Sequence, residues 1–65
     1  MSRNYTVEIL CDAELADTPK AILYQIDCEE VWIPKSLIED SYESDDGRIY
    51  IHIPEWFAEK EGLEW

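Results

Sequence analysis

The feature that most limits the fold of this chain is a run of two-residue alternation near its beginning. Apolar side chains occupy every second position from Tyr5 to Leu15, and mostly polar ones occupy the positions between them. This period is typical of a β-strand with one buried face, because successive side chains of a strand point to opposite sides. The spacing therefore predicts a first strand over residues 5–15. Asp, Thr and Pro then predict a turn over residues 16–20.

Three shorter runs repeat the strand pattern and predict an antiparallel sheet. Residues 21–26 place Tyr24 and two isoleucines inward, and residues 30–33 are rich in β-branched and aromatic side chains. A tight connection over residues 27–29 joins these two runs into a predicted hairpin. Residues 48–53 form the last predicted strand, with Ile49, Ile51 and Ile53 inward.

The rest of the chain predicts one helix and one surface loop. Residues 36–39 suit a single helical turn, and the polar residues 39–47 predict a loop. Pro54 then begins a helix, where its missing N–H group is harmless. Trp56 and Phe57 predict an apolar helix face, and Gly62 stands where a C-terminal cap is expected. The expected fold is α+β: one domain over residues 1–65, in which an antiparallel meander of three to four strands packs against a C-terminal helix.

Charge excludes several classes of partner. Sixteen Asp and Glu face five Lys and Arg, so the formal net charge is −11 at pH 7. Such a field repels nucleic acids and anionic membranes and attracts basic surfaces. We therefore expect a monomer that binds a positively charged protein partner, with no direct nucleic-acid binding and no membrane association.

Cysteine usage and the absence of a secretory segment point to a reducing compartment, and the cytoplasm is expected. Cys11 and Cys28 lack the Cys-x-x-Cys spacing and are interpreted as reduced core residues. The alternative is a single disulfide in a secreted protein. No stretch approaches the ~18 apolar residues of a membrane-spanning helix.

The residues give little support for catalysis, a metal or a cofactor. His52 is predicted to face solvent on a strand, and no motif around it supplies a nucleophile and an orienting group. The acidic loop fails the register of a calcium-binding loop, because Tyr42 and Ile53 fall at the first and last ligand positions. The two glycines are too far apart for a phosphate-binding loop. We expect a protein that is not an enzyme and that holds no cofactor.

The abundant carboxylates are the candidate partner-binding residues. On the first predicted strand, Glu8, Asp12 and Glu14 share the face opposite the core, with about 6.6 Å between residues two apart. Phosphates of one DNA strand advance about 3.4 Å along the axis, so a stiff row of carboxylates can approximate them. The alternative is that the charges serve solubility alone. The full candidate set is Glu8, Asp12, Glu14, Asp17, Glu29, Glu30, Glu39, Asp40, Glu43, Asp45, Asp46, Glu55 and Glu59.

Two stretches resemble a known group of proteins. Residues 31–40, Val-Trp-Ile-Pro-Lys-Ser-Leu-Ile-Glu-Asp, and residues 51–63, which begin Ile-His-Ile-Pro-Glu-Trp-Phe, are similar to small phage proteins, among them the type I-C anti-CRISPR inhibitors. The resemblance covers roughly the C-terminal half and carries over no functional residue. It implies a DNA mimic that occupies a Lys/Arg-lined DNA-binding groove of a type I CRISPR effector, Cascade, in the bacterial cytoplasm.

Two alternatives stand beside this hypothesis. A DNA mimic of the same chemistry would suit a restriction enzyme, a glycosylase or a repressor, because each presents a basic groove. A small adaptor or antitoxin-like protein would instead bind through an apolar patch at Trp56, Phe57 and Trp65. The sequence does not separate these targets, and it does not identify which carboxylates contact the partner.

Overall fold

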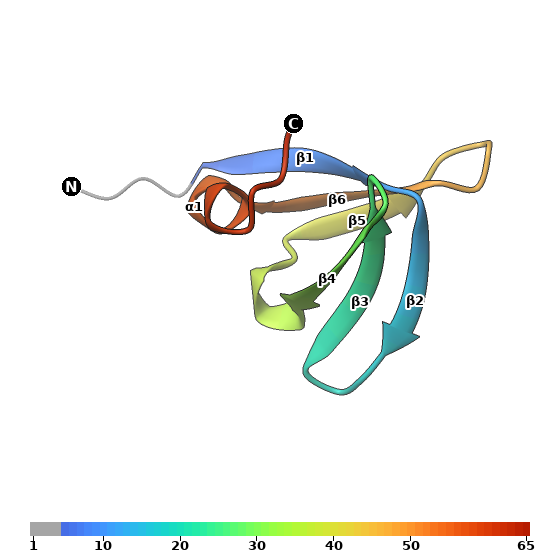
Figure 1. Ribbon diagram of the computed structural model, residues 1–65, viewed down its shortest axis with the longest axis horizontal. Coiled ribbons are helices and arrows are strands. Elements are labelled where there is room, and N and C mark those ends of the chain that lie inside the picture. Colours follow the sequence, from blue (N-terminus) through green and yellow to red (C-terminus); the bar gives the residue numbers. More distant parts are fainter. Residues whose placement is uncertain (1–4) are drawn as a thin grey trace.

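Two three-stranded antiparallel sheets and one short α-helix make up residues 5–65, the part of the chain that the computed structural model describes (Figure 1). The first sheet contains, in spatial order, β1 (Thr6–Cys11), β6 (Ile49–Pro54) and β5 (Asp40–Glu43). The second sheet contains β2 (Ala13–Asp17), β3 (Ala21–Ile26) and β4 (Glu29–Pro34). A 3₁₀ helix, η1 (Lys35–Leu37), follows β4, and the α-helix, α1 (Glu55–Lys60), follows β6. The predicted α+β class, with antiparallel strands and a C-terminal helix, is confirmed.

The first predicted strand is two strands, because the chain bends at Asp12. β1 ends at Cys11 and pairs with β6, whereas β2 begins at Ala13 and pairs with β3. The backbone N–H of Asp12 donates to the carbonyl of Gln25 at 2.7 Å, which attaches the bend to the second sheet. The strands therefore form two layers instead of the single meander expected from the sequence. Two layers bury the apolar side of each sheet against the other, which one sheet and a six-residue helix cannot do.

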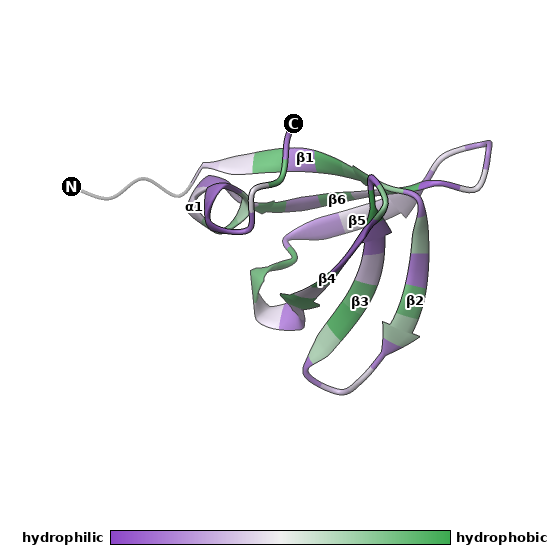
Figure 2. Cartoon of the chain, in the orientation of Figure 1, coloured by the Kyte–Doolittle hydropathy of each residue, from purple (hydrophilic) through white to green (hydrophobic). Residues whose placement is uncertain are grey.

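The core lies between the two sheets and beneath α1. Apolar and polar residues alternate along the strands (Figure 2), so each sheet has one apolar side. Burying one isoleucine contributes about 1.5–3 kcal/mol, and four of them are completely buried in residues 5–65. The inward positions predicted on β3 and β6 are confirmed. The buried apolar side chains are Ile9, Cys11, Tyr24, Ile26, Val31, Ile33, Ile51, Ile53, Phe57, Ala58 and Leu63.

The second strand departs from the predicted alternation at Leu15. The register of β2 on β3 shifts between Glu14 and Ala16, so a β-bulge lies there. Leu15 is 44% exposed rather than inward as predicted, and Ala16 stands opposite Leu23. One inserted residue reverses the side to which the later side chains of a strand point. Alternation in the sequence does not reveal such an insertion.

A two-residue turn joins β3 to β4 and confirms the predicted hairpin. Asp27 and Cys28 both have positive φ, 53° and 72°, as a type I′ turn requires. Neither is glycine, so both residues occupy the left-handed region that side chains disfavour. Cys28 is exposed, contrary to the prediction of a core residue, whereas Cys11 is buried as predicted. Both thiols are free.

The predicted loop over residues 39–47 contains an edge strand. Tyr42 of β5 stands opposite Tyr50 of β6, and the turn that follows is closed by a hydrogen bond from the N–H of Ser44 to the carbonyl of Arg48 at 2.8 Å. An exposed edge strand tolerates charged side chains. Because these residues are mostly polar, the sequence predicted a loop here instead of a strand. The helical turn predicted at residues 36–39 is the 3₁₀ helix η1, which begins one residue earlier and ends two residues earlier, at Leu37.

A glycine cap ends α1, as predicted. The N–H of Gly62 donates to the carbonyl of Glu59 at 3.1 Å, and the N–H of Leu63 donates to the carbonyl of Ala58 at 2.8 Å. This is the Schellman arrangement, whose cap residue takes a positive φ, and Gly62 has φ 75°. The cap turns the chain back toward the sheets, so Leu63 is buried in the core.

Only part of the predicted apolar helix face enters the core. Phe57 and Ala58 are buried, but Trp56 is 52% exposed and Trp65 is 55% exposed. Successive residues of a helix point about 100° apart, so a helix of six residues buries only a narrow stripe. The apolar patch expected at Trp56, Phe57 and Trp65 is therefore interrupted, because Phe57 belongs to the core.

Candidate functional site

The carboxylates are exposed, and neighbouring cations neutralise few of them. All sixteen Asp and Glu lie within residues 5–65, and none is buried. In that part of the chain, two ion pairs join a carboxylate to a Lys or Arg: Lys35 Nζ with Asp17 at 2.7 Å, and Arg48 Nε with Asp46 at 3.8 Å. The other fourteen of the sixteen carboxylates have no Lys or Arg partner there. The surface therefore stays strongly electronegative.

The predicted row of Glu8, Asp12 and Glu14 does not form. Glu8 lies on the outer face of β1, while Glu14 lies in β2 opposite Tyr24, a core residue. A row at two-residue spacing needs one continuous strand, and the change of sheet at Asp12 removes that continuity. The carboxylate of Asp12 instead accepts a hydrogen bond from the backbone N–H of Asp27 at 3.3 Å. This contact helps to hold the β3–β4 turn.

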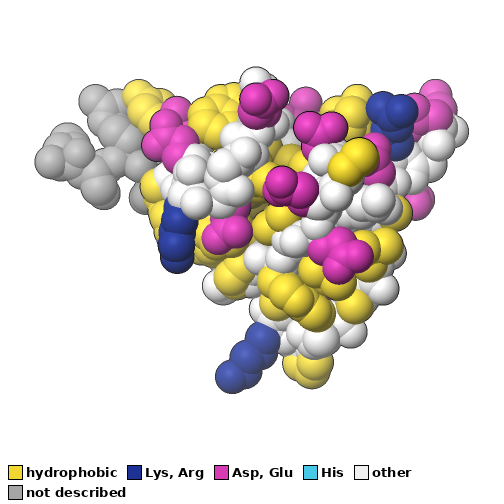
Figure 3. All heavy atoms as spheres, viewed as in Figure 1, with side chains coloured by type: hydrophobic (Ala, Val, Ile, Leu, Met, Phe, Trp, Pro, Cys, Tyr) yellow, Lys and Arg dark blue, Asp and Glu magenta, His cyan; other side chains and the backbone are white. Residues whose placement is uncertain are grey.

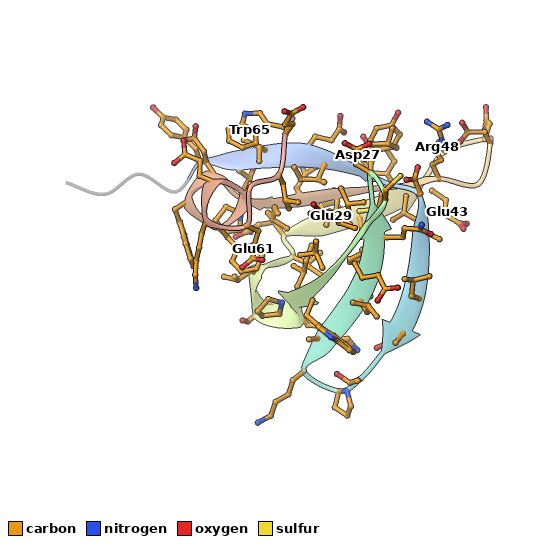
Figure 4. The ribbon with its side chains drawn as sticks, in the orientation of Figure 1. Asp27, Glu29, Glu43, Arg48, Glu61 and Trp65 are labelled. Carbon is orange, nitrogen blue, oxygen red and sulfur yellow. The ribbon has the colours of Figure 1, made fainter. Side chains whose placement is uncertain are left out.

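A different group of carboxylates surrounds the β3–β4 turn. We call it the Asp27 surface, and its members are Asp12, Asp27, Glu29 and Glu64. They line two adjoining recesses, with Arg48 at one of them, and Figure 4 shows Asp27 and Glu29 at the end of the hairpin. In Figure 3, acidic side chains are spread over the upper part of the face shown. Glu64 was not predicted, because only the cap of α1 brings the C-terminal segment back to this turn.

The remaining predicted carboxylates are spread over other elements. Asp17 is paired with Lys35, and Glu30 lies on the edge strand β4. The hydroxyl of Ser44 and the backbone N–H of Arg48 both donate to Asp46, and these hydrogen bonds lower the pKa of that carboxyl. The other members lie on or beside β5 and on α1: Glu39, Asp40, Glu43, Asp45, Glu55 and Glu59.

The outer side of the β1-β6-β5 sheet carries two rows of side chains that cross all three strands. One row is Glu8, His52 and Asp40, and the next is Leu10, Tyr50 and Tyr42. Paired residues of antiparallel strands point to the same side, so all six lie away from the core. We call these six residues the tyrosine face.

Tyr42 extends across β6 and connects the two rows of the tyrosine face. Its ring stacks on Tyr50, with centroids 5.4 Å apart and 23° between the planes, and meets His52 edge-on at 6.2 Å. Its hydroxyl donates to Oε2 of Glu8, which is also 3.3 Å from Nε2 of His52. The contact with Tyr42, followed by that with His52, lowers the pKa of Glu8, and the Glu8 carboxylate raises the pKa of Tyr42. Sequence reasoning missed Tyr42 because it fell within the predicted loop.

Neither a metal centre nor a known relative explains this surface. Within residues 5–65, no three His, Cys, Asp or Glu side chains are placed to hold a metal ion, and no helix is long and apolar enough to span a bilayer. A scan against protein-family models, a search of curated proteins and a search of solved structures each find no match to this chain. The exposed carboxylates and the tyrosine face are therefore the features of residues 5–65 that indicate a function.

Proposed function

We propose that this chain is a non-catalytic inhibitor that imitates DNA and occupies a Lys/Arg-lined DNA-binding groove of another protein. The observation that carries the proposal is that fourteen of the sixteen carboxylates have no Lys or Arg partner among residues 5–65. A surface of this kind attracts a cationic groove at long range and excludes polyanions. The inhibitor needs no cofactor and no reaction, because it acts by occupying the groove.

The scaffold holds many of these carboxylates in place before binding. Many belong to strands or tight turns, where neighbours on one side of a strand are about 6.6 Å apart and directly opposed residues on paired strands are about 5 Å apart. Phosphates of one DNA strand are spaced about 3.4 Å along the axis and farther apart through space. A basic groove can therefore exchange contacts with phosphates for contacts with carboxylates. Little further ordering of the inhibitor is required.

We propose a type I CRISPR effector, in the cytoplasm of a bacterial host, as the target. The support is the similarity of residues 31–40 and 51–63 to the type I-C anti-CRISPR inhibitors. An occupant of the groove that receives target DNA would prevent recognition of that DNA. A restriction enzyme, a glycosylase or a repressor with an equally basic groove is the alternative target.

Competition for DNA tests the proposal. The chain is titrated into a purified type I-C effector complex that holds a fluorescent target duplex, and release of the duplex is followed by anisotropy. We expect release at about 0.1 M salt, and we expect the affinity of the chain for the effector without DNA to fall by at least about tenfold as salt rises from about 0.1 M to about 0.5 M. The same titration on a restriction enzyme and a glycosylase shows whether the effector is the preferred target. Failure to release DNA from any of them, or a direct affinity for the effector that salt does not weaken, contradicts DNA mimicry.

Charge-neutral variants show whether the Asp27 surface makes the contact. The test variant removes three charges from it and leaves Asp12 to hold the turn: Asp27→Asn, Glu29→Gln and Glu64→Gln. The matched control removes three charges elsewhere: Glu14→Gln, Glu55→Gln and Glu59→Gln. We expect the test variant to weaken inhibition by about tenfold and the control variant to weaken it much less. Equal losses would mean that net charge acts without a defined contact surface.

A further inference from the structure

The tyrosine face combines a large aromatic surface with two carboxylates, Glu8 and Asp40, that have no Lys or Arg partner among residues 5–65. Tyr42 is 47% exposed, although it extends across the neighbouring strand to reach Glu8. Among residues 5–65, neither Glu8 nor Asp40 has a Lys or Arg within 4.0 Å. Stacked rings and two carboxylates therefore lie together on the outer side of one sheet, with no Lys or Arg of the described chain paired to them.

Nucleobases and planar cations both stack on tyrosine, and the negative charge of this face favours the cations. Nucleobases stack on aromatic side chains exposed on sheets, but the proteins that bind them also supply basic side chains for the phosphates. Here Glu8 and Asp40 occupy the row beside the rings, and the chain has a formal net charge of −11. The face therefore repels a polyanion and attracts a cation that has a flat surface of its own.

We propose that the tyrosine face binds an arginine side chain of the basic partner protein. The inference rests on the proposed function, because it names one contact within that complex. A guanidinium group is planar and weakly hydrated, so it stacks on the ring of Tyr42 while its N–H groups donate to Glu8 or Asp40. A lysine ammonium gains the charge attraction but has no planar surface for stacking. The hydrogen bond to Glu8 and the stack on Tyr50 fix the Tyr42 ring in place before the partner arrives.

Two peptides that differ only in their cation test this assignment. An Arg-Gly repeat peptide and a Lys-Gly repeat peptide of equal length are titrated into the ¹⁵N-labelled chain at low salt, and affinities are taken from the shifts of backbone amide signals. We expect the arginine peptide to bind about threefold more tightly, because stacking adds to the charge attraction. The largest shifts should fall on β5 and β6, around Tyr42 and Tyr50.

Substitutions then identify the ring that provides the preference. Tyr42→Leu should bring the two affinities to the same value, whereas Tyr42→Phe, which keeps the ring, should retain the preference for arginine. Trp32→Leu is the matched control, because Trp32 is 49% exposed on the other sheet, and it should leave the preference unchanged. Thermal melting shows whether each variant is folded. If a variant does not fold, the amide shifts of the unmodified chain still show where the arginine peptide binds.

The outcomes separate this inference from the proposed function. Equal affinities for the two peptides, a preference that survives Tyr42→Leu, or largest shifts on the Asp27 surface would each exclude the tyrosine face as the arginine site. Salt-sensitive competition with DNA would still support DNA mimicry in those cases. If neither peptide binds at low salt, attraction to basic protein surfaces is itself refuted, and both proposals are overturned.

Discussion

Alkaline pH should destabilise this protein sharply, because two weakly acidic groups are buried in the core and no Lys or Arg among residues 5–65 is paired with them. Burial, with a smaller effect of Asp12, raises the pKa of the Cys11 thiol from its ordinary 9.0 to about 12. Burial, followed by the neighbouring Cys11, Glu14 and Asp17, raises the pKa of the Tyr24 phenol from 10.0 to about 12. Cys11 is 0% exposed and Tyr24 is 2% exposed, so ionising either group places a charge in an apolar interior.

The direction and size of the effect follow from these two pKa values. A folded pKa above the unfolded one gives stability that is complete below the unfolded pKa and is lost as pH rises toward the folded pKa. At about pH 11, two pH units above the ordinary thiol value, Cys11 accounts for a loss of about 2.7 kcal/mol, and Tyr24, one unit above its ordinary value, for about 1.4 kcal/mol. The sum is at most about 4 kcal/mol, because part of the Tyr24 shift comes from Cys11 itself. It is still a large part of the roughly 3–10 kcal/mol expected for a domain of this length.

Urea unfolding followed by far-UV circular dichroism measures this loss at several pH values between about 8 and 11, with a reducing agent present. Cys11→Ala lowers the starting stability, because it leaves a small cavity, but should reduce the loss between these pH values by about 2.7 kcal/mol. Cys28→Ser, at the exposed thiol, is the control and should leave the loss unchanged. If Cys11→Ala loses as much stability over this range as the parent chain, burial of the thiol is not the cause.

Three further substitutions test the turn and the core. Cys28→Gly should raise the free energy of unfolding in urea by about 1 kcal/mol, because Cys28 has φ 72° and glycine adopts that conformation without a Cβ clash; an unchanged or lower value would show that the turn is not strained. Ile51→Ala should lower the free energy of unfolding by about 3 kcal/mol, because Ile51 is 0% exposed on the central strand β6. Trp32→Ala, at a 49% exposed position, should lower it by less than about 1 kcal/mol, and equal losses would contradict the described core.

Much of the fold could be predicted because it depends on neighbours in the sequence. Alternation identified the inward positions of β3 and β6, and the cap at Gly62 was recognisable from glycine at the end of an apolar helix pattern. These signals are local, since a strand period or a helix cap involves only a few consecutive residues. The excess of negative charge is a property of composition and needs no coordinates.

The arrangement of the candidate site followed from pairing between distant segments. The bend at Asp12 sends one alternating run into two sheets, which separates Glu8 from Glu14 and removes the expected carboxylate row. Tyr42 and Glu8 are 34 positions apart in the sequence, and they come into contact because β5 and β1 both pair with β6. The local sequence specifies to which side of its strand a side chain points, but not which strand lies beside it. Strand register and the arrangement of the two sheets depend on the burial of apolar area over the whole chain. The sequence alone therefore determined the net charge, whereas the packing of the two sheets determined which residues lie beside each charged side chain.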